Sequence, residues 1–202
     1  MVYGGTDTKR GASRWPPAYG LTGDAYEAVF AAQAAAGQDI HGEARLVHSL
    51  GVRSVLDGGC GTGRVGRELA RRGLVVVGVD VDPRMLDTAR RLAPQIPWVL
   101  GDLADVDVGR TFDAVVLAGN VLVLITRGTE RAVVTNMARH LRPGGLLVAG
   151  FQLLRRRLAL SRYDAIATAA DLELAERWAG WDRSPWAAGG DYAVSVHRRR
   201  AD

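Results

Sequence analysis

The stretch "VLDGGCGTGRVG", from Val55 to Gly66, decides the fold. A hydrophobic run ends in an acid, Asp57, and five glycines follow within the next nine residues. Glycine tolerates positive φ and lets a ligand approach the backbone closely, so we expect a strand, a tight turn and then a helix. Gly61, Gly63 and Gly66 match G-x-G-x-x-G, a pattern that is weak evidence of nucleotide binding when it stands alone.

Strands and helices alternate after this turn. Continuous apolar strands separated by amphipathic helices predict a mostly parallel sheet with helices on both faces, that is, a single α/β domain. The last two strands are expected to form an antiparallel hairpin at the sheet edge. The expected strands are 53–57, 74–80, 98–102, 112–118, 146–151, 172–181 and 191–199, and the expected helices are 22–37, 42–50, 64–72, 82–92, 129–141 and 162–170.

The chain has 202 residues, enough for one sizeable domain. We expect residues 1–20 to be a flexible segment, residues 21–51 a helical cap and residues 52–202 the main domain. A single cysteine, Cys60, and the lack of an apolar leader predict a cytoplasmic protein. The longest apolar runs are too short to span a bilayer, so no membrane partner is expected. We expect a monomer or a homodimer.

The net charge is +4, and arginine carries nearly all of the positive side. The basic clusters are short, and no stripe of basic residues alternates with aromatic ones, so nucleic acid is a disfavoured partner.

Asp57 restricts the ligand that the glycine turn can hold. A pyrophosphate at the helix start would lie beside this carboxylate, and like charges about 4 Å apart cost roughly 4 kcal/mol near a protein surface. The turn therefore favours a cationic ligand. Asp80 and Asp102 end the next two expected strands, at the sheet edge where such folds bind a nucleoside. The alternative is that strand-end acids merely cap the following helices; for three acids beside this turn we favour the ligand.

Residues 53 to 151 resemble the class I S-adenosylmethionine-dependent methyltransferases. The matching segments are "VLDGGCGTG", "VVGVDVDPRML", "GDLADV", "FDAVVLAGNVL" and "LRPGGLLV", in the order and spacing of that family. The resemblance implies a Rossmann-like, seven-stranded sheet and S-adenosylmethionine as cofactor. It further implies that the methionine part lies on Gly59, Gly61, Thr62 and Gly63, the ribose on Asp80, and the adenine on Val81, Met85, Asp102 and Leu103, with Ala118, Gly119 and Asn120 beside the methyl group.

Two residues are candidates for catalysis. His41, in "DIHGE", lies in the segment that folds over the cofactor in such enzymes, and a histidine suits a general base near neutral pH. The alternative is an exposed histidine in a helix-initiating turn. Asn120 is placed by its motif, although asparagine also favours helix caps. His140 and His197 are expected at the surface, and no cluster has metal-ligand spacing, so we predict no metal.

The predicted function is methyl transfer from S-adenosylmethionine to a small-molecule acceptor. One alternative is methylation of RNA or another nucleic acid, but the Asn/Asp-Pro-Pro-Tyr/Phe signature is missing and the chain reads "GNVL" there. The other alternative is a protein that binds S-adenosylmethionine without catalysis.

Overall fold

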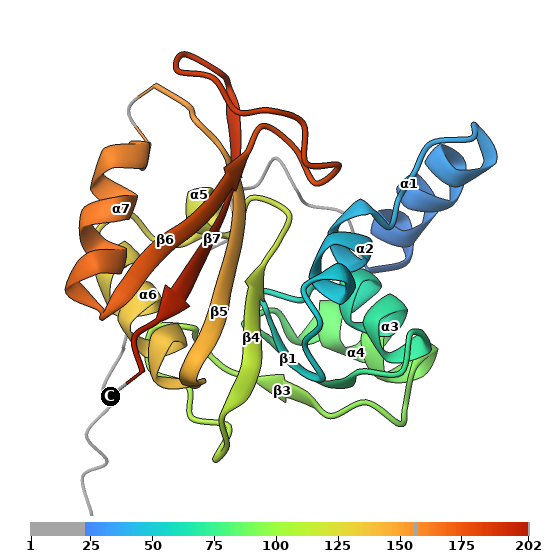
Figure 1. Cartoon of the computed structure of the whole chain (residues 1–202). Helices are drawn as coiled ribbons and strands as arrows, with labels where there is room; N and C mark the ends of the chain where they lie inside the picture. The colour runs from blue at the N-terminus through green and yellow to red at the C-terminus, as the bar shows by residue number, and fades with distance from the viewer. Residues whose placement is uncertain (1–22, 156, 202) are drawn as a thin grey trace, which may run out of the picture.

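A seven-stranded sheet forms the centre of the protein in a computed structural model that describes residues 23–155 and 157–201 (Figure 1). The predicted flexible segment 1–20 lies outside the described residues. The strand order is β3-β2-β1-β4-β5-β7-β6. The strands are β1 (Ser54–Gly58), β2 (Val75–Asp80), β3 (Trp98–Leu100), β4 (Phe112–Leu117), β5 (Leu141–Gln152), β6 (Leu172–Trp178) and β7 (Tyr192–Arg199).

The first five strands are parallel, and β7 runs antiparallel to both of its neighbours, β5 and β6. Asp57 pairs with Gly78, and Asp80 pairs with Leu100, so the carboxyl ends of β1, β2 and β3 lie along one edge of the sheet. The C-terminal hairpin is present as predicted, with β6 at the edge of the sheet.

Helices cover both faces of the sheet (Figure 1). The helices are α1 (Gly23–Ala35), α2 (Gly42–Ser49), α3 (Arg64–Arg71), α4 (Pro83–Leu92), α5 (Val121–Leu124), α6 (Glu130–Arg139) and α7 (Leu160–Ala169). Residues of α5, α6 and α7 pack into the core on one face, and residues of α2, α3 and α4 pack into the core on the other. The predicted Rossmann-like α/β fold is therefore confirmed.

The first helix, α1, is the least embedded of the set. Only Gly23 of α1 is buried, and the helix projects from the body of the protein beside α2 and α4 (Figure 1). Two side-chain hydrogen bonds join α1 to the glycine turn and to α3. Glu27 accepts from Thr62 Oγ1 at 2.5 Å and from Arg67 Nη2 at 2.6 Å. The predicted division into a cap of residues 21–51 and a main domain stays a prediction.

Two elements differ from the sequence expectation. The sequence predicted a strand over 112–118 and no helix after it; in the structure Asn120, with a φ of 68°, is the N-cap of the short helix α5. Strand β5 begins at Leu141, before the expected breaker "RPGG", because Leu141 pairs with Phe112 before a bulge in the ladder.

His140 and His197 are buried, so the prediction that they lie at the surface is wrong. His140 Nδ1 lies 2.9 Å from the Asn136 carbonyl oxygen, and its Nε2 accepts from the Val108 N–H at 3.4 Å. His197 lies in the middle of the sheet against Tyr163, and burial lowers its pKa to about 4. Strand β7 is buried continuously from Ala193 to His197, because helices cover both faces of the sheet.

Candidate functional site

The glycine turn has room for a side-chain atom at one of its buried positions, Gly61. Gly59 N–H and Cys60 N–H both donate to the Val79 carbonyl, at 2.8 and 3.0 Å, which ties the turn to β2. Gly61 has a φ of 55°, and a Cβ built there would meet no atom of residues 23–155 and 157–201 within 4 Å. At Gly59 and Gly63, by contrast, a Cβ would strike the side chains of Val121 and Trp98. The open space of the turn therefore lies over Gly61.

Two adjoining cavities lie along the carboxyl ends of β1, β2 and β4. They share Gly59 and Leu124, so together they form one continuous site across the glycine turn. The first cavity is lined by Gly59, Asp80, Val81, Gly101, Asp102, Leu103, Val121, Leu124 and Ile125. The second is lined by Tyr26, Gly59, Cys60, Gly61, Met85, Ala118, Gly119 and Leu124.

Asp80 is the central polar group of the first cavity. Its side chain is 1% exposed, and its Oδ2 accepts from Gly61 N–H at 2.7 Å while Oδ1 accepts from Asp82 N–H at 2.9 Å. Burial raises the pKa of this carboxyl, and the two backbone bonds oppose that shift. A carboxylate accepts about four hydrogen bonds in all, so Asp80 keeps capacity for ribose hydroxyls in the cavity.

Apolar side chains flank Asp80 and suit the flat faces of an adenine. Val81 follows β2, and Leu103 follows β3, as the sequence predicted. Asp102 lies at the same edge, and its Oδ1 accepts from Ala104 N–H at 2.9 Å. Val121, Leu124 and Ile125 complete the wall, and sequence reasoning missed them as site residues because it missed α5.

The second cavity suits the amino-acid end of the cofactor. It contains the open position above Gly61 together with Ala118 and Gly119, which the family motifs place beside the methyl group. Met85 also lines this cavity, although the sequence had placed it on the adenine with Val81. Tyr26 reaches it from α1, and burial raises the pKa of the Tyr26 hydroxyl. Burial also raises the pKa of the Cys60 thiol well above its ordinary value, so the thiol stays protonated, which is unsuited to a nucleophile.

Three predicted cofactor residues lie behind the turn rather than in the lining of either cavity. Asp57 is buried, and its Oδ2 accepts from the Gly66 N–H of α3 at 2.9 Å. Thr62 is buried and donates to Glu27, and Gly63 packs on Trp98. Asp57 therefore holds the start of α3 in place and does not line either cavity. It can influence a ligand only indirectly, by fixing the position of the glycine turn.

The two predicted catalytic residues lie apart. Asn120 follows Gly119 at the rim of the second cavity, and its Oδ1 accepts from Gln152 N–H at 2.8 Å, which joins the end of β4 to the end of β5. His41 lines neither of the two cavities. It lies in a separate cavity between α1 and α3, so its assignment as a base stays a prediction.

The raised pKa of Asp57 makes the folding stability of the protein depend on pH. Burial raises its folded pKa to about 7, against an ordinary value of 3.8. As pH rises from about 4 to 7, the unfolded carboxyl ionises while the folded one stays protonated, so folding becomes less favourable. The free energy of unfolding should fall relative to that of Asp57→Asn by about 1.4 kcal/mol per pH unit, or roughly 4 kcal/mol in all.

Chemical denaturation of both proteins between pH 4 and 8 measures this difference. Asp113→Asn is the control, because hydrogen bonds to Arg53 and Ser54 hold the pKa of Asp113 below its usual range. Above about pH 4 this carboxyl is ionised in both the folded and the unfolded protein, so its wild-type-minus-variant difference should stay nearly constant over the range measured. A flat difference for Asp57→Asn would show that its folded pKa is ordinary.

Within residues 23–155 and 157–201, no group of three or more His, Cys, Asp or Glu side chains could hold a metal ion. Over the same part of the chain, no helix combines the length and apolar character needed to cross a bilayer.

Comparison with known proteins identifies the family. A methyltransferase-domain family model matches residues 55–145. A TehB-like S-adenosylmethionine-dependent methyltransferase from Corynebacterium glutamicum is 34% identical, with a TM-score of 0.82, and the match covers 92% of this chain and 100% of that one.

Two curated relatives match a shorter region. One is the dTDP-4-amino-2,3,4,6-tetradeoxy-D-glucose N,N-dimethyltransferase of Saccharopolyspora spinosa, 34% identical over 62% of this chain and 52% of its own. The other is the demethylmenaquinone methyltransferase of Tropheryma whipplei, 39% identical over 55% of this chain and 48% of its own. The match therefore spans about half the length of these curated relatives.

The family follows from the match to the Corynebacterium protein, which is 34% identical and covered over its full length. The chain belongs to the class I S-adenosylmethionine-dependent methyltransferases, with S-adenosylmethionine as its cofactor.

Proposed function

We propose that the protein transfers a methyl group from S-adenosylmethionine to a small-molecule acceptor. The observation that carries this proposal is the continuous site formed by the two cavities, because its Asp80 half suits a nucleoside and its Gly61 half opens toward Ala118 and Gly119. The names of the two curated relatives each describe a small-molecule acceptor, an amino sugar nucleotide and a menaquinone precursor. These names support the class of acceptor and leave its identity open.

The residues around the site would bind the cofactor, orient the two reactants and keep water out. The cofactor supplies an activated methyl group, so placement of the two reactants supplies much of the rate. We propose that Asp80 holds the ribose and that the Gly61 backbone holds the methionine part. The apolar side chains of α5 exclude water from the first cavity, and Tyr26 covers the second from α1. That placement also supports a covering role for residues 21–51.

Two binding and activity measurements test the proposal. Calorimetry should show tight binding of S-adenosylhomocysteine and weak binding of NAD, because the described lining of the two cavities contains Asp80 and Asp102 and no arginine or lysine. Transfer of labelled methyl groups should then be measured on small amines, phenols, carboxylates and sugars. Tight NAD binding would overturn the cofactor assignment. Binding of S-adenosylhomocysteine without methyl transfer to any acceptor would favour a binding protein.

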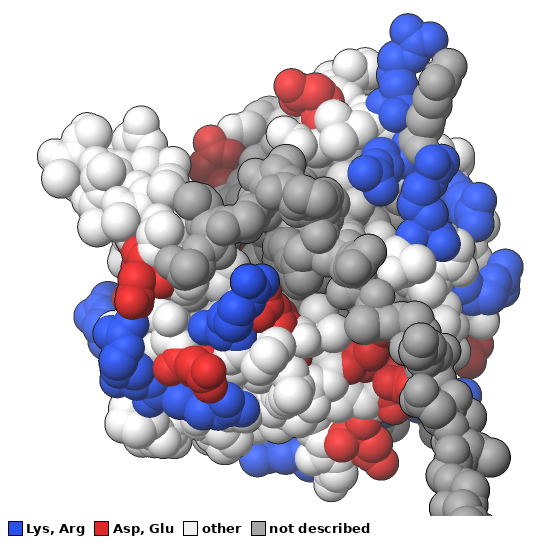
Figure 2. Space-filling model, turned by 180° about the vertical axis from the view of Figure 1, so that it is seen from behind, with Lys and Arg blue, Asp and Glu red and all other residues white. Residues whose placement is uncertain are grey.

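Nucleic-acid methylation is the second candidate, and one surface feature favours it. Arginines gather on one side of the face shown in Figure 2, while acidic and basic side chains alternate over much of the rest. Arg127, Arg157 and Arg162 line a hollow beside Glu130. Binding of RNA with a steep salt dependence, together with methyl transfer to it, would favour this candidate over a small acceptor.

Asn120 offers a test of the site beside the methyl group. Asn120→Gly keeps the freedom for a φ of 68° and removes the bond to Gln152, so the rim between β4 and β5 should loosen while the turn persists. We expect the methyl-transfer rate to fall about tenfold or more, from the loss of one hydrogen bond and of placement, with little change in S-adenosylhomocysteine affinity.

Steady-state kinetics on the first acceptor found and calorimetry on the same samples measure the two effects. Asn136→Gly is unsuitable as a control, because Asn136 bonds the carbonyls of Leu103 and Val106 near the adenine wall. The matched control is Asp107→Gly, which likewise removes a side-chain oxygen that accepts from a backbone N–H, that of Gly109 at 2.7 Å, in an exposed loop outside both cofactor cavities. An equal loss of affinity and rate in Asn120→Gly would show that Asn120 holds the cofactor instead.

A further inference from the structure

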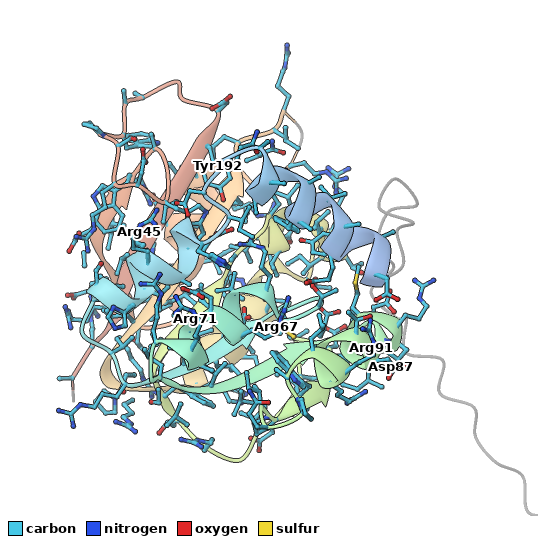
Figure 3. The ribbon with its side chains drawn as sticks, turned by 90° about the vertical axis from the view of Figure 1, so that its right-hand side faces the viewer. Arg45, Arg67, Arg71, Asp87, Arg91 and Tyr192 are labelled. Carbon is cyan, nitrogen blue, oxygen red and sulfur yellow. The ribbon has the colours of Figure 1, made fainter. Side chains whose placement is uncertain are left out.

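Polar contacts contribute much of what holds helix α1 against the rest of the protein. Only Gly23 of this helix is buried, so little of it is packed into the core. Figure 3 shows α1 above α3 and α4, with Arg67 labelled on the first of these helices and Arg91 on the second. Two acids of α1, Asp24 and Glu27, accept hydrogen bonds from these arginines. The position of α1 therefore depends on individual side chains.

The two acids differ in what they reach. Asp24 is paired with Arg91 at the surface, where the two side chains are 77% and 58% exposed, and pairs of this kind stabilise a protein little. Glu27 is only 26% exposed, and its two oxygens bond two different elements. Oε1 accepts from Thr62 Oγ1 at 2.5 Å, and Oε2 accepts from Arg67 Nη2 at 2.6 Å. Glu27 is therefore the stronger of the two attachments.

Thr62 carries this contact into the glycine turn. It lies between Gly61 and Gly63, and it is fully buried. The Thr62 hydroxyl donates to Glu27, and a buried hydroxyl that loses its partner is costly. Glu27 thus joins α1 to the turn on which we propose that the methionine part of the cofactor lies.

Tyr26, the residue before Glu27, lines the second cavity of the cofactor site. Its ring packs edge-on against Phe30, with the ring centres 5.0 Å apart, and the Arg64 guanidinium lies over the other ring of this pair, that of Phe30. Tyr26 and Glu27 are neighbours in one turn of α1. A movement of the helix that separates Glu27 from Thr62 would therefore also move Tyr26 relative to the cavity.

We propose that Glu27 is a positioning residue for the cofactor, and that its bonds to Thr62 and Arg67 keep Tyr26 closed over the second cavity. The inference rests on the proposed function, because it takes the methionine part of the cofactor to occupy that cavity. Glu27 acts through Tyr26 and itself lines neither cofactor cavity. A cover that opens more often releases a bound ligand sooner, so the Glu27 carboxylate should prolong the time for which the cofactor stays bound.

Release of S-adenosylhomocysteine from Glu27→Ala measures this role. We expect the dissociation rate to rise about tenfold and the association rate to change less than about threefold, because changes within one binding site act mainly on dissociation. Surface plasmon resonance on the immobilised full chain gives both rates. Asp24→Ala is the matched control, because it removes the other acid that joins α1 to its neighbours, and it should leave both rates unchanged. A wild-type dissociation rate in Glu27→Ala would overturn the proposal.

A conservative variant and a double variant separate positioning from a general loss of structure. Glu27→Gln keeps an oxygen that can accept from Thr62 and loses the charge that pairs with Arg67, so its dissociation rate should lie between those of the wild type and Glu27→Ala. Tyr26→Ala removes the cover itself, so adding Glu27→Ala to it should raise the dissociation rate by less than about threefold. A further tenfold rise in the double variant would overturn the proposal, because Glu27 would then act without Tyr26.

Hydrogen exchange in the absence of any ligand tests the attachment of α1 separately from the cofactor site. An undocked helix of 13 residues is marginally stable in water, so the backbone amides of residues 28–35 should exchange about tenfold faster in Glu27→Ala than in the wild type or Asp24→Ala. Equal exchange in the three proteins would overturn the proposal. Faster exchange in Glu27→Ala without S-adenosylhomocysteine binding by the wild type would instead refute the proposed cofactor site, and with it this role of Glu27.

Discussion

Gly61→Val is expected to abolish cofactor binding. The new Cβ would enter the open space above the turn, where no atom of the described residues lies within 4 Å and where we propose that the methionine part of the cofactor lies. The two methyl groups of valine would occupy that part of the second cavity. We expect the affinity for S-adenosylhomocysteine to fall at least about a thousandfold, a loss of about 4 kcal/mol. Calorimetry on the folded protein measures it.

Backbone strain is the competing explanation, and Gly73→Val controls for it. Gly73 has a φ of 88°, and a Cβ there also meets nothing within 4 Å, but it lies after α3, away from both cofactor cavities. Each variant should lose about 1–2 kcal/mol of folding stability from a side chain at positive φ. Only Gly61→Val should lose the cofactor. Tight binding by a folded Gly61→Val would show that the ligand lies elsewhere.

Asp80→Ala should have the second-largest effect. The substitution removes the two hydrogen bonds expected with the ribose, each worth about 1.5–3 kcal/mol when one partner is charged. It also leaves Gly61 N–H and Asp82 N–H without their acceptor, so the turn loses its support from β2. We expect S-adenosylhomocysteine affinity to fall by a factor of about 10² to 10⁴.

Two further variants separate these effects. Asp80→Asn keeps an oxygen that can accept from Gly61 N–H but loses the charge, so its affinity should lie between those of the wild type and Asp80→Ala. Asp87→Ala, an exposed acid on α4 paired with Arg90, should leave the affinity unchanged. Wild-type affinity in a folded Asp80→Ala would refute the role of Asp80.

The strand-end pattern predicted much of the site because parallel strands bring their carboxyl ends to one edge. Asp80, Asp102 and the residues after them line the first cavity as that rule requires. Asp57 obeys the same rule in sequence, yet its side chain turns under the helix and bonds Gly66. The sequence pattern places a side chain at a strand end, but packing decides which way it points.

Two other features depend on packing that the sequence leaves open. The position of His41 depends on how α1 and α2 lie on α3, and Glu27 and Glu43 set that arrangement through pairs with arginines distant in the chain. Helix α5 begins after a left-handed residue at Asn120 and has only the four apolar residues 121–124, too few to show a helical period in the sequence. Apolar periodicity alone does not distinguish a short buried helix from a strand.

The position of β7 between β5 and β6 has a consequence for synthesis of the chain. Strand β6 leaves the ribosome before β7, although β7 is its only strand partner in the described structure. One edge of β5 also pairs only with β7. Until residues 192–199 emerge, two strand edges therefore stay unpaired, and such edges invite association between nascent chains. Ribosome-bound chains that stop before Tyr192 should accordingly be the ones that chaperones protect, while release of the last strand closes the sheet in a single step.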